Sequence, residues 1–173
     1  MQDFVRRDVA ITEASSVADI DDLRTLFIEY QQWLGLDLTF QNFSTELRSL
    51  PGDYRPPKGR MLLARQADGP LIGGVAMKPL SDGICEMKRL YVRPPWRGSG
   101  MGRALANAIV AAGRTAGYAR MRLDSFSRLS AAIRLYRSMG FREIDPYYEN
   151  PLDGVIYMEK ALDERDSASA NRG

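Results

Sequence analysis

A run of glycines, RGSGMG at residues 97–102, is the segment of this chain with the clearest chemical meaning. It lies between an apolar stretch that ends at Val92 and a stretch with helical spacing, so the glycines stand where a strand gives way to a helix. The first N–H groups of a helix have no partner inside it and carry the positive end of its dipole. Glycines let an anion approach that backbone closely, and Arg97 adds a guanidinium. The segment therefore predicts a phosphate-binding turn.

Two known kinds of phosphate-binding loop share features with this segment. A P-loop would need Lys after its last glycine, but Arg103 follows Gly102, which excludes that loop. The dinucleotide pattern GxGxxG is met at its first two positions by Gly98 and Gly100, and Asp124 stands where a ribose-binding acid would be expected. Its third glycine position is Arg103, and too little chain follows for a second mononucleotide-binding half. An NAD(P)-binding oxidoreductase is kept as an alternative.

The residue types that are missing restrict the chemistry further. The chain contains no histidine, which excludes Ser-His and Cys-His nucleophilic catalysis and removes the commonest transition-metal ligand. Cys85 is the only cysteine, so an internal disulfide and a Cys-rich zinc site are excluded as well. We therefore expect no metal site. Acid-base work must come from carboxylates, tyrosines, lysines, the backbone or water.

The elements that must position the glycine turn follow from apolar periodicity and from glycine and proline punctuation. Strands are expected at 9–13, 61–65, 71–79, 84–92, 118–123, 141–144 and 155–162, and helices at 19–34, 44–50, 100–115 and 129–139. The unit 84–123 should be a right-handed βαβ crossover with parallel strands, while the other connections favour antiparallel pairing. We predict an α/β mixed-sheet domain over 1–163, with a disordered polar tail at 164–173.

Three segments together resemble a known family. RGSGMG fits the pattern RxxGxG, CEMKRLYVRPPW precedes it at 85–96, and LSAAIRLYRSMGF follows at 129–141. With these segments the chain resembles the GNAT superfamily of acyl-CoA-dependent N-acyltransferases, specifically from Glu86 to Phe141 and in topology over nearly its whole length. The resemblance implies a GNAT-like fold and acetyl-CoA as co-substrate. In that family the turn holds the pyrophosphate of coenzyme A, and the preceding strand binds the pantetheine arm and polarises the thioester carbonyl. By resemblance, the cofactor-binding residues are Leu90, Tyr91, Val92, Arg97, Gly98, Ser99, Gly100, Met101, Gly102 and Arg103.

Tyr136 lies in LYRSMGF, which is similar to the YxxxGF segment of the family. The resemblance implies that its hydroxyl protonates the departing coenzyme A thiolate, as a phenol can. The alternative is that Tyr136 packs with the other apolar residues of its helical stripe and that its hydroxyl bonds locally.

Glu86 stands six residues before Val92, at a position that resembles the one where some family members carry a general base. An attacking ammonium must lose a proton, and a carboxylate near the thioester could accept it. The alternative is a surface or salt-bridged glutamate, paired with Lys88 or Arg89, with water as the base. Cys85 has no histidine to activate it, so we expect it to pack and the amine to attack the thioester directly.

The acceptor is the least constrained part of the prediction. Residues 147–150, with the sequence YYEN, form a loop that could line an acceptor pocket or an edge or dimer surface, so a homodimer stays open. A net charge of +2 gives no argument for nucleic acid, and no apolar run is long enough for a membrane span. The first residues lack the apolar core of a signal peptide, which favours a cytoplasmic protein. We predict an acetyl-CoA-dependent N-acetyltransferase acting on a primary amine in a ternary complex, with a non-catalytic coenzyme A-binding module as the other alternative.

Overall fold

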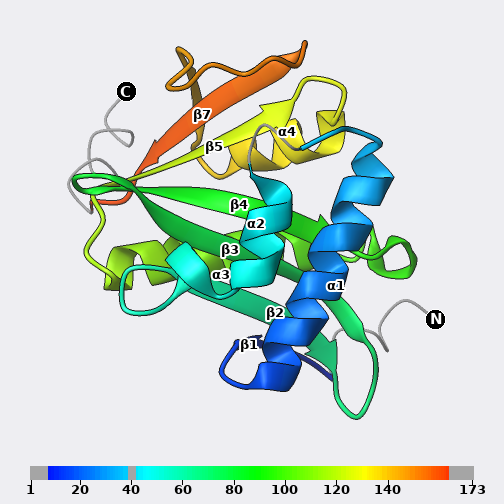
Figure 1. Cartoon of the computed structure of the whole chain (residues 1–173). Coiled ribbons are helices and arrows are strands. Elements are labelled where there is room, and N and C mark those ends of the chain that lie inside the picture. The colour runs from blue at the N-terminus through cyan, green and yellow to red at the C-terminus, as the bar shows by residue number, and fades with distance from the viewer. Residues whose placement is uncertain (1–7, 39–41, 164–173) are drawn as a thin grey trace.

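Seven strands form one mixed sheet in the order β1-β2-β3-β4-β5-β7-β6 (Figure 1). The structure is a computed structural model and describes residues 8–38 and 42–163. The strands are β1 (Val9–Glu13), β2 (Arg60–Gln66), β3 (Leu71–Ser81), β4 (Ile84–Val92), β5 (Arg120–Phe126), β6 (Arg142–Ile144) and β7 (Val155–Ala161). Among the described residues, β4 and β5 are the only neighbouring strands that pair in parallel, and all other neighbouring strands pair antiparallel.

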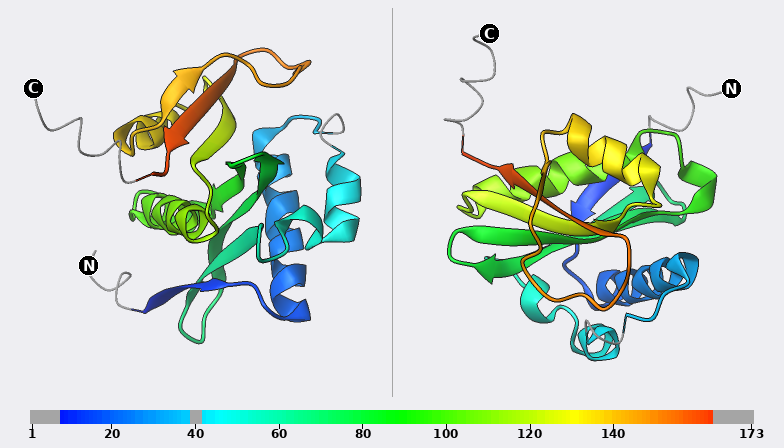
Figure 2. Two further views of the ribbon diagram at one scale, coloured as in Figure 1. Left: turned by 90° about the vertical axis from the view of Figure 1, so that its left-hand side faces the viewer. Right: turned by 90° about the horizontal axis from the view of Figure 1, so that it is seen from above.

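In the described residues, four α-helices cover the two faces of the sheet (Figure 2). The helices are α1 (Val17–Leu34), α2 (Phe43–Ser49), α3 (Met101–Thr115) and α4 (Ser130–Ser138), with single turns of 3-10 helix at η2 (Gly52–Tyr54) and η3 (Pro94–Trp96). α1 and α2 lie on one face, and α3 and α4 lie on the other (Figure 2). No helix in the described part of the chain is long and apolar enough to span a membrane.

This arrangement confirms the predicted mixed α/β fold. The helix α3 connects β4 to β5, as expected of the βαβ unit. A sheet with one parallel pair is not the doubly wound parallel sheet of dinucleotide-binding enzymes, which removes the support for that alternative. The strand predicted at 118–123 is displaced and covers Arg120–Phe126 instead. The predicted tail at 164–173 lies outside the described residues.

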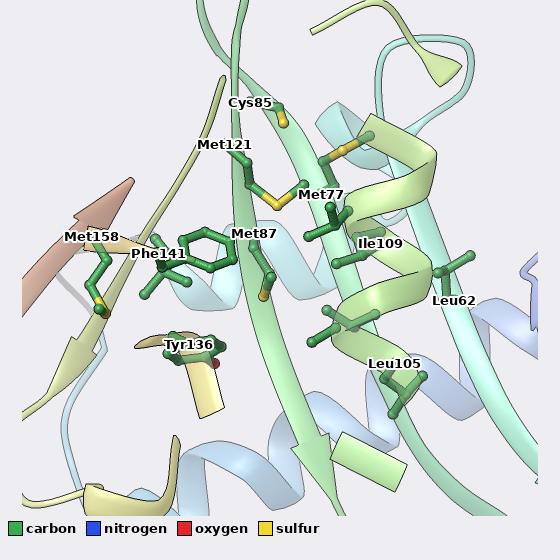
Figure 3. Packing of buried hydrophobic residues seen from close by; sticks show 14 of the residues in the cluster. Leu62, Met77, Cys85, Met87, Leu105, Ile109, Met121, Tyr136, Phe141 and Met158 are labelled. Carbon is green, nitrogen blue, oxygen red and sulfur yellow. The ribbon is translucent and has the colours of Figure 1, made fainter. Parts of the chain in front are cut away.

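The core divides into one cluster on each face of the sheet. On the face of α3, Leu105 and Ile109 pack with Met77, Met87 and other buried apolar side chains (Figure 3). On the opposite face, buried apolar side chains of α1 form the second cluster together with residues of β2, β3 and β4. Because both faces of the central strands are buried, these strands are held rigidly, which suits them to position a site.

The helix α1 begins two residues before the predicted start at Asp19. Ser16 is its N-cap, and its Oγ accepts a hydrogen bond from the Asp19 N–H at 3.1 Å. The Asp19 carboxylate in turn accepts hydrogen bonds from the N–H groups of Ser15, at 3.0 Å, and Ser16, at 3.2 Å. This capping box satisfies backbone donors at the helix start and so allows α1 to begin at Val17.

Replacing Ser16 by Ala should lower the free energy of unfolding by about 1 kcal/mol, because the Asp19 N–H loses its acceptor. For a chain of this size, that change corresponds to a fall in Tm of roughly 2–4 °C. Calorimetry of the two proteins measures it. Ser16→Asp keeps an acceptor at the cap and should restore most of the loss. An unchanged Tm for Ser16→Ala would show that the capping box contributes nothing to stability.

Candidate active site

β4 and β5 pair only at one end and then separate. Their parallel register holds Ile84, Cys85 and Glu86 opposite β5, and no later residue of β4 pairs with β5. Figure 1 shows the two strands diverging beyond this point. The edge of β4 from 87 to 92 therefore faces a cleft instead of a neighbouring strand, and its backbone N–H and C=O groups can bind an extended ligand as an added strand would.

A β-bulge in β4 lies where the strands separate. Ala76 pairs with Lys88 and Gly74 pairs with Tyr91, so two residues of β4 stand opposite one residue of β3. Arg89, the first of the two, has a φ of 61°, in the left-handed region that is unfavourable for residues with a side chain. A bulge bends its strand and re-aims neighbouring groups, and it directs β4 away from β5 here.

Contacts with α2 hold the strained Arg89. Its Nε lies 3.1 Å from Oε2 of Glu46, and its guanidinium lies 5.0 Å from the ring centre of Phe43. The Tyr54 hydroxyl donates a hydrogen bond to the other Glu46 oxygen at 2.6 Å. Arg89 is buried, so this ion pair compensates for the loss of its hydration and fixes the bulge.

The cleft between the diverging strands has a volume of about 340 Å³. One wall is the free half of β4, the other is β5 with the start of α4, and the C-terminal part of α1 closes one side. Of the predicted cofactor residues, Leu90, Tyr91, Val92 and Arg97 line this cleft. The other six, Gly98 to Arg103, form the turn and first residues of α3 that follow Arg97 directly.

The glycine turn has the expected backbone. Gly98 and Gly100 have φ values of 77° and 85°, and Gly100 is the N-cap of α3. No acid stands in the first turn of this helix, and no side chain of residues 8–38 or 42–163 caps it, so its first N–H groups have no side-chain acceptor in the described chain. A Cβ on Gly102 would meet only Leu135 at 3.8 Å and Val92 at 4.0 Å. Protein packing therefore does not require glycine at position 102, whereas the close approach of a ligand to the backbone would.

The Arg97 side chain contacts the wall of the cleft, although it was predicted to contact the phosphates at the glycine turn. Its Nε donates a hydrogen bond to the Val92 carbonyl oxygen at 3.0 Å. Its guanidinium stacks 4.5 Å from the ring centre of Trp33 and 5.5 Å from that of Tyr91. The guanidinium thus occupies the wall of the cleft and covers one of the backbone groups predicted to bind pantetheine.

Tyr136 brings a hydroxyl to the opposite wall. It is 7% exposed, and its ring packs edge-on against Phe141 at 5.8 Å (Figure 3). The side chain also lines the cleft, and its hydroxyl makes no hydrogen bond to any residue in 8–38 or 42–163. Burial raises the pKa of Tyr136 above that of an ordinary phenol, and the nearby Tyr30 and Asp124 raise it further. The group is therefore a protonated donor at neutral pH.

Glu86 lies in a second, smaller hollow on the other side of the bulge. It is buried, accepts a hydrogen bond from the Tyr147 hydroxyl at 2.6 Å, and lies 3.7 Å from Nζ of Lys88. Of the two ion pairs considered in the alternative interpretation of Glu86, the one with Lys88 is formed, and Arg89 pairs with Glu46. The hollow is also lined by Tyr147, Tyr148 and Glu149, three of the four residues from the loop that was expected to form an acceptor pocket or an interface.

Asp124 completes a buried network at the border of the two hollows. Its Oδ1 lies 3.5 Å from Lys88 Nζ, and its Oδ2 accepts a hydrogen bond from Tyr148 at 2.6 Å. Burial alone would raise the pKa of Asp124, but the Lys88 ammonium and these hydrogen bonds outweigh it and hold the pKa below its ordinary value. Lys88 therefore forms ion pairs with both Glu86 and Asp124. Tyr147 and Tyr148, from the loop after β6, form hydrogen bonds to these two carboxylates on β4 and β5.

Cys85 makes no contribution to this site. Its side chain is fully buried, and burial raises the pKa of its thiol to about 12, so the reactive thiolate is absent at neutral pH. Its position confirms the expectation that it packs. In the described part of the chain, no group of three or more carboxylate and cysteine side chains could hold a metal ion.

These features agree with the comparison with known proteins. The family model described as "Acetyltransferase (GNAT) family" matches residues 20–141, which is more than half of the chain and includes the cleft, the bulge and the glycine turn. The chain belongs to the GNAT acetyltransferase family. It is therefore an acetyl-transferring enzyme, which disfavours the non-catalytic alternative.

Individual relatives agree with this assignment. An uncharacterised N-acetyltransferase of Schizosaccharomyces pombe is 44% identical over 152 residues, covering 87% of this chain and 93% of the relative. The crystal structure of a GNAT acetyltransferase from Staphylococcus aureus is similar with a TM-score of 0.74 at 18% identity, covering 90% of this chain and 99% of that one. The PaiA N-acetyltransferase of Thermoplasma acidophilum, in complex with coenzyme A, has a TM-score of 0.69 at 22% identity, covering 88% and 98%. The two solved structures show that this acetyltransferase shares their fold.

The structure does not bring all predicted residues of the acetyltransferase into one hollow. Tyr136 lines the cleft, whereas Glu86 lines the second hollow, and only Lys88 and Arg89 line both. Sequence reasoning missed Tyr30 and Arg128, which line the cleft from the side of α1 and from the connection between β5 and α4. Tyr30 followed the apolar pattern of α1, and no motif marked Arg128.

Proposed function

We propose that this enzyme transfers an acetyl group from acetyl-CoA to a primary amine by direct attack in a ternary complex. The observation that carries the proposal is the free edge of β4, which begins at the bulge, runs through a cleft that Tyr136 lines, and ends at the glycine turn of α3. An elongated ligand with a phosphate at one end and a reactive group at the other would match these features in order.

The residues of the turn fit the phosphates of coenzyme A. Gly100 begins α3 with a positive φ, and position 102 leaves space beside first-turn N–H groups that no side chain caps. Arg103 adds a positive charge in the same turn, although its guanidinium donates a hydrogen bond to Ser138 at 2.9 Å. Leu90 and Val92 would bind the pantetheine amides through their backbone. When bound, acetyl-CoA supplies the activated acetyl group as a thioester.

The chain's own residues then divide the work of transfer. The N–H groups on the free edge of β4 near the bulge would hydrogen-bond the thioester oxygen and stabilise the negative charge that develops there. The amine nitrogen forms the new bond to the acetyl carbon as the carbon–sulfur bond breaks. Tyr136 donates its proton to the leaving sulfur and is reprotonated by solvent. Its raised pKa keeps the hydroxyl protonated at neutral pH but makes it a weaker acid than an ordinary phenol, so its proton is taken up by the thiolate only as that group forms beside it.

The proton of the attacking ammonium requires an acceptor. Glu86 is a candidate because it lies on β4 just before the bulge and its hollow shares Lys88 and Arg89 with the cleft. Its carboxylate already accepts a hydrogen bond from Tyr147, so a water chain between Glu86 and the amine would have to carry the proton. Water alone is the second candidate for the base.

The experiment that tests this function measures release of the coenzyme A thiol from acetyl-CoA across a panel of primary amines. We expect release that depends on both substrates, an acetylated amine in the mass spectrum of the products, and no acetylated enzyme when acetyl-CoA is added alone. Acetyl-enzyme without amine would contradict direct attack. Binding of acetyl-CoA without turnover of any amine would favour a coenzyme A-binding module.

The position of Arg97 predicts a signal on cofactor binding. Since the guanidinium covers Trp33 and bonds to the Val92 carbonyl, it must leave both if it is to contact the pyrophosphate and free the β4 edge. The chain has two tryptophans, so in Trp96→Phe only Trp33 emits when the excitation wavelength is one that tryptophan alone absorbs. Saturating coenzyme A should then change Trp33 fluorescence, and the change should vanish in Trp96→Phe/Arg97→Ala. Calorimetry establishes the coenzyme A concentration that saturates the protein. Unchanged Trp33 emission at that concentration would show that Arg97 stays in place.

A further inference from the structure

The charged side chains that line the cleft are predominantly cationic. Lys88, Arg89, Arg97 and Arg128 face one carboxylate, Asp124. Lys88 is shared by Glu86 and Asp124, and Arg89 is paired with Glu46. Arg97 bonds to the Val92 carbonyl and stacks on Trp33, and the resemblance assigns it to the phosphates of the donor. After these assignments, Arg128 is the remaining cation among the described residues that line the cleft.

Arg128 has a fixed position but no anionic partner among residues 8–38 and 42–163. Its Nη2 donates a hydrogen bond to the Leu34 carbonyl oxygen at the end of α1, at 2.6 Å, and its guanidinium lies 5.8 Å from the ring centre of Phe126. It forms no ion pair with any acid of residues 8–38 and 42–163. A guanidinium has five N–H donors, so the remaining ones can bind a carboxylate side-on.

Tyr30 offers a second donor to the cleft, from the side of α1. Its ring packs against Trp33 and Tyr91, with ring centres 6.4 and 5.7 Å away, and its hydroxyl makes no hydrogen bond within the described chain. Burial raises the pKa of Tyr30 to about 12, while the charges of Arg89 and Arg128 oppose this rise and that of Asp124 adds to it. The hydroxyl is thus protonated at neutral pH and lies within electrostatic reach of both arginines.

The positive charge of the side chains that line the cleft favours some amine acceptors over others. A second ammonium on the acceptor would meet Arg128 and Arg89, and among the described residues that line the cleft no unpaired acid could bind it. A carboxylate would find a guanidinium and a phenol, both free to donate. Glu149 lines the second hollow, outside the cleft, so it can attract the amine end without reversing the preference at Arg128.

We propose that the acceptor is a small molecule that carries a carboxylate beside its amine, as a free amino acid does, and that Arg128 and Tyr30 bind this carboxylate. The proposal rests on the proposed function, since it assumes that the donor occupies the β4 edge of the same cleft. The amine would then lie toward the bulge, where the cleft borders the hollow of Glu86.

The test compares free L-amino acids with their primary amides as acceptors, with thiol release from acetyl-CoA as the readout. An amide lowers the pKa of the neighbouring amine and so provides more of the reactive free base, which means that intrinsic reactivity favours the amides. We nevertheless expect at least one amino acid to exceed its amide about tenfold or more in kcat/KM, because a charged hydrogen bond is lost with the carboxylate.

Variants then assign the effect to residues. Arg128→Gln should lower kcat/KM for the preferred amino acid by about 10- to 100-fold and leave its amide unchanged. Tyr30→Phe should raise KM for the amino acid with little change in kcat. Arg134 of α4 is exposed and lines neither hollow, so Arg134→Gln is a matched loss of charge that should change nothing.

Any other result would contradict either the carboxylate site or the proposed acetyltransferase function on which it rests. Amides that equal or exceed every amino acid, or an Arg128→Gln loss that is the same for both, would overturn the site. If no amino acid is acetylated, thermal shifts with N-acetyl amino acids and N-acetyl amino amides replace turnover, and equal or absent shifts also overturn it. Failure of acetyl-CoA itself to bind would instead overturn the proposed function.

Discussion

Replacing Tyr136 by Phe should lower kcat for thiol release by about 100- to 10,000-fold, the range that a general acid contributes. The substitution removes only the hydroxyl, which bonds to no described residue, and it keeps the ring against Phe141. Stability and the affinity for coenzyme A should therefore change little. The rate falls because the sulfur must then leave as an unprotonated thiolate or take its proton from water.

Three measurements on one preparation separate this role from packing. Thiol release gives kcat, calorimetric titration gives the dissociation constant of coenzyme A, and thermal unfolding gives Tm. Tyr118→Phe is the matched control, since the Tyr118 hydroxyl bonds to the Lys58 carbonyl at 2.8 Å, away from the cleft. A Tyr136→Phe enzyme that keeps its full rate would show that the hydroxyl is no acid. A parallel loss of rate, binding and Tm would assign the residue to packing.

Replacing Gly102 by Asp should abolish coenzyme A binding while the protein becomes slightly more stable. An acid in the first turn of α3 interacts favourably with the helix dipole, by roughly 0.3–1 kcal/mol, and Asp is a better helix former than Gly. The new side chain has room in the protein itself. It places a negative charge where the pyrophosphate should lie, and we expect affinity for coenzyme A to fall by about 100-fold or more.

Gly102→Ala separates volume from charge in this experiment. It adds only the Cβ, and helix propensity should raise stability by up to about 1 kcal/mol. Its loss of affinity should lie between the wild type and Gly102→Asp. If glycine at position 102 serves ligand binding, both variants should raise the stability of the protein and lower its affinity for coenzyme A. Wild-type affinity in Gly102→Asp would place the phosphate elsewhere.

Local sequence patterns predict much of the fold. The strand β5 shows both what such a pattern predicts and what it misses. Apolar residues at 119, 121 and 123 alternate with polar ones, and Ser125 interrupts the pattern, so it predicts an end at Leu123. In the structure the strand continues to Phe126, because its pairing with β7 extends to Val155. The polar Asp124 is tolerated there since Lys88 and Tyr148 satisfy its carboxylate. Partners so distant in the sequence leave no trace in a local pattern.

The candidate site was predictable to a similar degree. The glycine turn and Tyr136 are marked by motif; the turn lies at the start of α3 and Tyr136 lines the cleft, and their roles stay predictions. The buried link from Tyr147 to Glu86 joins residues 61 positions apart, and neither residue's neighbours indicate it. Arg97 was expected at the phosphate turn, but the rings of Trp33 and Tyr91 attract its guanidinium to the cleft wall. Such an interaction depends on how α1 packs against β4.

Thermal unfolding with and without acetyl-CoA, coenzyme A, NAD and NADP tests the central claim most directly, because the claim concerns what the cleft binds. A ligand at 100 times its dissociation constant adds about 2.7 kcal/mol to the free energy of unfolding. For a chain of this size we expect acetyl-CoA and coenzyme A to raise Tm by roughly 5–11 °C, and Gly102→Asp to lose the shift. No shift with either coenzyme A compound, or a shift with NAD or NADP alone, would contradict the account.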